Sequence, residues 1–158
     1  MAMGLVSLVV VGTVLAADAT PGAKREEFKQ KVENIRDERK KKIVERVDAN
    51  LAEINKRRTD AMTRHLDKMS EILAKVKLRG GATTAAQVAV VEARSAVAAQ
   101  AAKTYTITIS TEYKLKFNVG ETMKALKTDL QAVHQKIVDA RKTIADVIRS
   151  VKKASPAP

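Results

Sequence analysis

The chain of 158 residues contains no cysteine and no tryptophan, and it has only two phenylalanines and two tyrosines. Without cysteine there is no disulfide bond, so the fold must be stable through packing alone. With so few aromatic rings, the chain lacks the side chains on which proteins stack the bases of single-stranded nucleic acid. Ala, Val, Ile and Leu supply most of the apolar content, which is typical of thin helical packing.

Motifs for enzymatic chemistry are also missing. There is no cysteine nucleophile, no glycine-rich phosphate loop and no Gly-x-Ser-x-Gly turn. His65 and His134 are the two histidines, and neither has a second His or Cys at the spacing of metal ligands. We therefore expect no catalytic activity, no cofactor, no metal site and no small-molecule substrate.

The first 19 residues predict export. The run "GLVSLVVVGTVLA", Gly4 to Ala16, is apolar and uncharged, and "ADA", Ala17 to Ala19, fits the cleavage pattern of a secretory signal. As a helix this run would span about 20 Å, less than the hydrocarbon core of a bilayer at about 30 Å. We expect a cleaved signal peptide over 1–19 and an extracytoplasmic protein, with an uncleaved anchor as the alternative.

Positive charge exceeds negative charge along the chain. Thirty Lys and Arg against 18 Asp and Glu give a formal net charge of +12. Such a charge favours anionic partners, namely phospholipid headgroups, acidic wall polymers or nucleic acid. Since export would keep the protein away from an intracellular genome, nucleic acid is not expected as the partner.

A long first helix is predicted over about 21–79. Thr20 and Pro21 suit an N-cap and first helical position, and Gly80 and Gly81 are expected to end the helix. Its apolar positions recur about every 3.7 residues, which predicts a straight or slightly right-handed helix. This predicted seam consists of Phe28, Val32, Ile35, Arg39, Ile43, Val47, Leu51, Ile54, Arg58, Met62, Leu66, Met69, Leu73 and Val76.

A shorter second helix is predicted over about 84–103. Thr84 and Gln87 have the spacing of a capping box. The segment that follows is rich in Ala and Val and carries few charges, so it is apolar over most of its circumference. Because such a helix needs neighbours on more than one side, we expect it to be the central element.

A third helix is predicted over about 111–152, although its start allows two interpretations. Apolar residues follow a period of about 3.6 from Leu115 to Val151. Tyr113, Leu115, Phe117 and Val119 also alternate, so they could form a hairpin with the preceding segment. The turn at 110–112 has neither Gly nor Asn, which tight hairpins prefer, and this favours the helix.

The segment "TYTITIS", 104–110, has the period of a strand. Tyr105, Ile107 and Ile109 alternate with threonines, and we interpret the segment as an extended connector whose apolar residues cap the end of the bundle. The alternative is a lone strand that pairs with another copy or with a ligand protein through these three residues.

Together these elements predict an all-α protein. Its helical domain would cover 20–153 as an elongated antiparallel three-helix coiled-coil bundle with one extended connector, followed by a disordered tail over 154–158. A helix of the predicted length is too long for a compact domain of this size.

Three segments carry a resemblance to known proteins: "REEFKQKVENIRDERKKKIVERVDANL", "YTITIS" and "NVGETMKALKTDLQAVHQKIVDARKTI". With the export signal, this plan resembles the uncharacterised small secreted helical proteins of candidate-phyla bacteria. The resemblance implies export and a helical plan, and it brings no activity, cofactor or site residue. The basic, cysteine-free chain is also similar in character to small periplasmic helical chaperones, although their repeated Leu-Thr-x-x-Gln motif is absent.

Clusters of basic residues are the candidate binding site. They could hold an anionic surface, or they could be solubilising charge partly neutralised by neighbouring acids. The candidate residues are Arg36, Arg39, Lys40, Lys41, Lys42, Lys56, Arg57, Arg58, Lys152 and Lys153.

From these features we expect an exported, non-catalytic structural or interaction module at the cell envelope. Its partner would be an anionic envelope surface or another envelope protein, and it could form homo-oligomers. The alternative function is a chaperone-like protein, or one that binds anionic polymers or membrane surfaces.

The signal-peptide prediction can be tested on protein recovered from its native host. We expect N-terminal sequencing of the extracytoplasmic fraction to begin at Thr20, because the cleavage pattern ends at Ala19. An intact leader on a cytosolic pool would contradict export, and an intact leader on a membrane pool would support the anchor.

Overall fold

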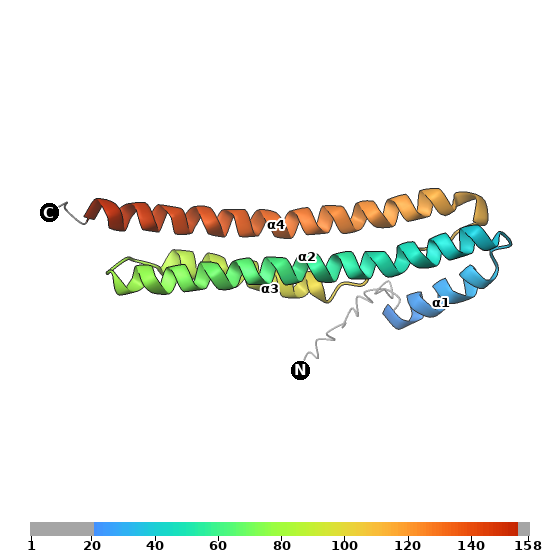
Figure 1. Ribbon diagram of the computed structural model, residues 1–158, viewed down its shortest axis with the longest axis horizontal. Coiled ribbons are helices and arrows are strands. Elements are labelled where there is room, and N and C mark those ends of the chain that lie inside the picture. The colour runs from blue at the N-terminus through green and yellow to red at the C-terminus, as the bar shows by residue number, and fades with distance from the viewer. Residues whose placement is uncertain (1–20, 155–158) are drawn as a thin grey trace, which may run out of the picture.

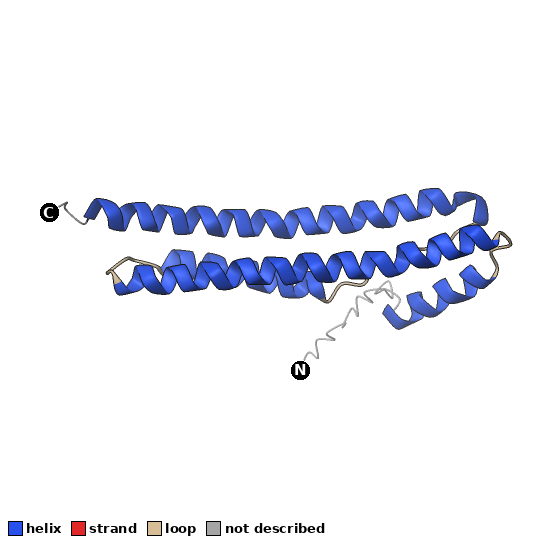
Figure 2. Cartoon of the chain, viewed as in Figure 1, coloured by secondary structure: helices blue, strands red, loops and turns tan. Residues whose placement is uncertain are grey.

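The computed structural model describes residues 21–154, and these form four α-helices and one short 3-10 helix (Figure 2). The predicted signal peptide and residues 155–158 of the predicted tail lie outside the described residues. Within 21–154 there is no strand, so the all-helical prediction is confirmed for this part of the chain. The elements in order are α1 (Pro21–Glu33), α2 (Glu38–Leu78), α3 (Thr84–Ala101), η1 (Glu112–Lys114) and α4 (Leu115–Ala154).

Two long helices, α2 and α4, determine the shape of the molecule (Figure 1). They have 41 and 40 residues, so each is about 60 Å long, and they run side by side in the same direction. The shorter α3 runs antiparallel to both and packs against the C-terminal half of α2. The still shorter α1 folds back against the N-terminal half of α2.

The prediction of one continuous helix over 21–79 is wrong, because the chain turns at 34–37 between α1 and α2. Asp37 is the N-cap of α2, and its Oδ1 accepts hydrogen bonds from the backbone N–H groups of Arg39 (2.9 Å) and Lys40 (3.2 Å). The turn is also tied to the start of the last helix, since Glu112 accepts from the N–H of Arg36 (3.3 Å) and from Lys40 Nζ (3.2 Å).

The end of α2 agrees with the prediction. Gly80 has a φ of 78°, which favours glycine, and its N–H donates to the carbonyl of Lys77. The N–H of Gly81 donates to the carbonyl of Val76, which completes a Schellman motif. A β-carbon on Gly81 would come within 2.6 Å of the Val76 side chain, so this second glycine is needed for close packing.

The other boundaries differ slightly from the predicted ones. α3 ends at Ala101, two residues before the predicted end, and α4 begins at Leu115 after the 3-10 turn. The alternative hairpin over 105–119 does not form within the described residues, because the stretch from Leu115 onward is helical.

The core has two parts along the length of the molecule. The first cluster lies between α2, α3 and α4, and the second between α1, α2, the connector and α4; Leu130 packs against both. The first cluster consists of Met62, Leu66, Leu73, Ala86, Val90, Ala93, Val97, Val133, Ile137, Ala140 and Ile144. The second consists of Phe28, Val32, Ile35, Val44, Leu51, Ile107, Ile109, Leu115 and Leu126.

The connector contributes directly to the second cluster. Ile107 is 1% exposed and Ile109 is 4% exposed, while Tyr105 packs partly against the same cluster. The prediction that these residues cap the end of the bundle is therefore wrong, because they fill its interior. Burial of both isoleucine side chains also leaves them unavailable to a strand partner.

We expect Ile107→Ala to lower the free energy of unfolding by about 2–4 kcal/mol, because a buried isoleucine loses its contacts and leaves a cavity. Urea unfolding followed by circular dichroism would measure the change. Thr108→Ala is the matched control, since Thr108 is the exposed neighbour in the same segment. Equal, small effects of the two substitutions would contradict a structural role for the connector.

Candidate functional site

The predicted basic residues lie at three separate places along the molecule. Arg36–Lys42 are at the turn before α2 and in its first helical turn, whereas Lys56–Arg58 lie in the middle of α2. Lys152 and Lys153 lie at the C-terminal end of α4, at the opposite end of the bundle from the start of α2 (Figure 1). The structure therefore does not bring these residues together in one patch.

Several of these residues are paired with acids on the same surface. Lys56 lies 2.7 Å from Asp60, and Arg57 lies 3.2 Å from Glu53, each pair one helical turn apart. Exposed pairs of this kind contribute little stability, and they neutralise charge that an anionic surface would otherwise meet. Arg58 differs, because it borders a groove.

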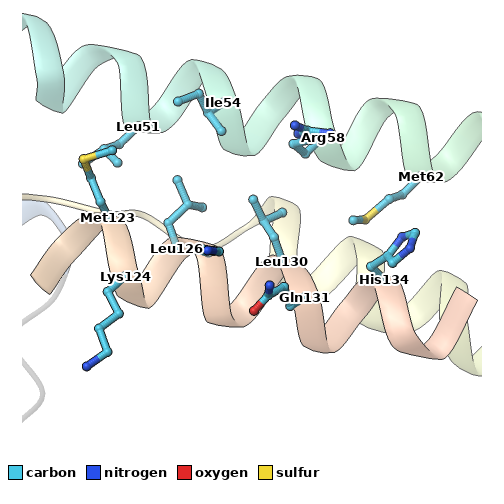
Figure 3. Close-up of a pocket in the computed structure, with 11 residues that line it drawn as sticks. Leu51, Ile54, Arg58, Met62, Met123, Lys124, Leu126, Leu130, Gln131 and His134 are labelled. Carbon is cyan, nitrogen blue, oxygen red and sulfur yellow. The ribbon is translucent and has the colours of Figure 1, made fainter. Parts of the chain in front are cut away.

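The groove lies between the parallel helices α2 and α4. In Figure 3, Leu51 and Ile54 of α2 face Met123, Leu126 and Leu130 of α4. The volume of the hollow is about 750 Å³. Its lining residues are Leu51, Ile54, Arg58, Met62, Met123, Lys124, Leu126, Lys127, Leu130, Gln131 and His134.

A second hollow continues along the same two helices toward their N-terminal ends. It has a volume of about 410 Å³. Its lining residues are Lys40, Ile43, Val44, Val47, Glu112, Tyr113, Leu115, Lys116 and Val119. We call the two hollows together the α2–α4 groove; from Lys40 to Met62 it extends about 33 Å along α2.

The groove combines exposed apolar side chains with positive charge. Ile43 is 57% exposed and Met123 is 49% exposed, and both line it. In the larger hollow every charged lining residue is basic: Arg58, Lys124 and Lys127. None of these three has an ion-pair partner among residues 21–154. An apolar hollow with unpaired cations at its edge is suited to a ligand with an apolar face and acidic flanks.

The predicted seam of α2 is only partly correct over this stretch. Leu51 is buried, and Val47 and Ile54 are partly buried against the second cluster, as expected. Ile43 and Arg58 are exposed instead, and the buried positions next to the seam are Val44, Asp48, Asn55 and Thr59. The core on α2 is therefore wider than the predicted stripe, and the side of that stripe that carries Ile43, Ile54 and Arg58 lines the groove. The sequence contained one sign of this wider core, because Val44 lies beside the predicted stripe and extends the apolar surface of α2.

Buried polar side chains, which the sequence did not predict, surround the end of α3. Asn55 Nδ2 donates to the carbonyl oxygens of Gln100 (3.0 Å), in the last turn of α3, and of Lys103 (3.2 Å), just after it. Gln100 Nε2 donates to Asn55 Oδ1 (3.0 Å) and to the Tyr105 hydroxyl (2.7 Å). These bonds give the last turn of α3 side-chain partners in addition to its backbone hydrogen bonds.

The same network continues to α4 through Asp129. Its Oδ2 accepts from Lys103 Nζ (2.8 Å) and from the Tyr105 hydroxyl (2.6 Å). Those two hydrogen bonds hold the pKa of Asp129 below its usual range. Burial, together with the bond to Asp129, raises the pKa of Tyr105 to about 12.

Asp48 connects α1, α2 and the connector. Its side chain is buried, and it forms an ion pair with Arg25 of α1 and accepts from the N–H of Ile107 (3.2 Å). A buried carboxylate needs such partners. These contacts indicate that Asp48 stabilises the fold by joining the three elements.

Other kinds of site find no support in the described residues. His65 is exposed, and His134 lines the groove. Within 21–154 no three His, Cys, Asp or Glu side chains come together in a way that could hold a metal ion. None of the helices over the same residues has an apolar stretch of the length that crossing a bilayer requires.

Comparisons of the chain with protein-family models, with curated proteins and with solved structures gave no match.

The environment of Tyr105 can be tested by spectroscopic titration of a Tyr113→Phe variant. Tyr113 is 96% exposed, so its replacement leaves the fold intact and makes Tyr105 the remaining tyrosine. We expect tyrosinate absorbance to develop near pH 12 rather than near pH 10. Because the folded-state pKa is raised, the contribution of Tyr105 to stability is complete below pH 10 and is lost as the pH rises through about 12.

Asp129→Asn is the companion variant, since it removes the carboxylate that accepts from the Tyr105 hydroxyl. The tyrosinate midpoint should then move toward lower pH. An unchanged midpoint near pH 10 in the Tyr113→Phe protein would contradict the buried hydrogen bond.

Proposed function

We propose that the protein is a non-catalytic binding module that holds an anionic partner in the α2–α4 groove. The observation that carries this proposal is the composition of the larger hollow, which is apolar at its base and borders on unpaired Arg58, Lys124 and Lys127. The basic clusters at the two ends of the molecule would add long-range attraction. The groove therefore replaces the scattered basic surface as the main contact.

The scaffold we infer for this function is an antiparallel three-helix coiled coil of α2, α3 and α4, with α1 added against α2. Export to the cell envelope is part of the same proposal. It is supported by the apolar run Gly4–Ala16 and the cleavage pattern after it. In that location the anionic partner would be an envelope surface or another envelope protein.

A chaperone-like role is the second candidate. Met62 and Met123 line the larger hollow, and methionine side chains adapt to apolar partners of different shape. Such a protein would suppress the aggregation of a model client at low and high salt alike. Loss of that effect in Met123→Glu protein would locate client binding in the groove.

The proposal can be tested by attaching an environment-sensitive fluorophore to Met123→Cys, which is specific because the chain has no other cysteine. The probes are polyglutamate and phosphatidylglycerol vesicles, with phosphatidylcholine vesicles for comparison. We expect the acidic probes to shift the emission at low salt, and the shift to weaken as salt rises because exposed charges are screened.

Arg64→Cys, labelled in the same way, is the control, since Arg64 is exposed on α2 and does not line the groove. Equal responses at the two positions, or an equal response to neutral and acidic probes at Met123→Cys, would contradict binding in the groove.

A further inference from the structure

We infer that the partner is an acidic amphipathic α-helix of another protein, which lies along the α2–α4 groove as an additional helix of the bundle. This inference rests on the proposed function and specifies its ligand. The helix would place an apolar face between α2 and α4, and Asp or Glu residues on its flanks would meet Arg58, Lys124 and Lys127.

The shape of the groove supports a helix. Two parallel helices form its walls over about 33 Å, a length that a helix of about 22 residues would match. Helix-in-groove recognition uses apolar anchors at i, i+3, i+4 and i+7 of the ligand. The groove provides apolar positions at similar intervals on α2, namely Ile43, Val47, Leu51, Ile54 and Met62.

The depth of the groove favours a helical ligand over a membrane surface. Leu51 and Leu126 line the larger hollow, yet they are only 2% and 4% exposed, so they lie at its base. A flat lipid surface would touch the edges of the groove and leave these side chains uncovered. A helix side chain inserted between α2 and α4 can reach them.

The positive charge of the groove favours an acidic ligand over a second copy of the chain. Two copies joined through this face would bring two surfaces with an excess of positive charge together, and like charges in contact oppose binding. Glu112 is the single acid that lines either hollow, and Lys40 already lies 3.2 Å from it. The groove therefore selects a ligand of the opposite charge.

The test uses the full chain and two designed helical peptides of about 22 residues. Both carry the same Leu and Ile face; one has Glu on both flanks and the other has Lys. Fluorescence anisotropy of the labelled peptides measures binding at low and high salt. We expect the Glu peptide to bind about tenfold or more tightly than the Lys peptide at low salt, because three ion pairs differ between the complexes.

A charge-reversal variant makes the test specific for the groove. In Arg58→Glu, Lys124→Glu, Lys127→Glu protein, the preference should switch to the Lys peptide. The control carries Arg46→Glu, Arg64→Glu and Lys75→Glu, which make the same charge change at exposed positions of α2 outside the groove. This control should keep the preference for the Glu peptide. Circular dichroism of both variants confirms that they are folded.

Three outcomes would overturn the inference. The first is equal binding of the two peptides by the native chain, and the second is the same loss of preference in both triple variants. The third is binding of phosphatidylglycerol vesicles at the labelled Met123→Cys position without binding of the Glu peptide; this would exclude the helix while leaving the proposed function in place. Absence of both vesicle and polyglutamate binding there would contradict the proposed function itself.

Discussion

The hydrogen bonding of Asn55 to the end of α3 is the interaction on which the rest of the structure depends. With 18 residues, α3 is less than half the length of α2 and α4, so it ends inside the bundle. Asn55 is buried at this end, and its amide donates to the carbonyl oxygens of Gln100 and Lys103. Beyond this point the connector and α1 replace α3 against α2 and α4. The two core clusters meet at this junction.

The groove follows from the same arrangement. Because α3, the connector and α1 all lie on one side of the α2–α4 pair, the other side has no covering element among the described residues. The face of α2 that carries Ile43 and Ile54 therefore remains open to a partner. Because the short elements cover only one side of α2 and α4, the same arrangement accounts for both the buried core and the exposed apolar surface.

Much of the helical plan could be predicted from sequence, but its details depended on tertiary contacts. Gly80 and Gly81 indicated the C-terminal end of α2, and the apolar stripe from Leu115 onward indicated the course of α4. The turn before α2 contains neither Gly nor Pro, so helical periodicity continued through it, and only the N-cap residue Asp37 marked the break. Burial of Asp48 and Asn55 could not be predicted, because polar residues enter a core only where partners far along the chain satisfy them. The groove was not predicted either, because its position depends on which face of α2 these long-range contacts bury.

The parallel course of α2 and α4 gives the groove a polarity. Each helix has a partial positive charge at its N-terminus and a partial negative charge at its C-terminus, and here both positive ends lie at the same end of the molecule. A helical ligand would be most stable with its own dipole opposed to these two. The groove would thus prefer one direction of the ligand helix. A peptide and its reversed sequence would have the same composition and the same faces, yet they would bind differently.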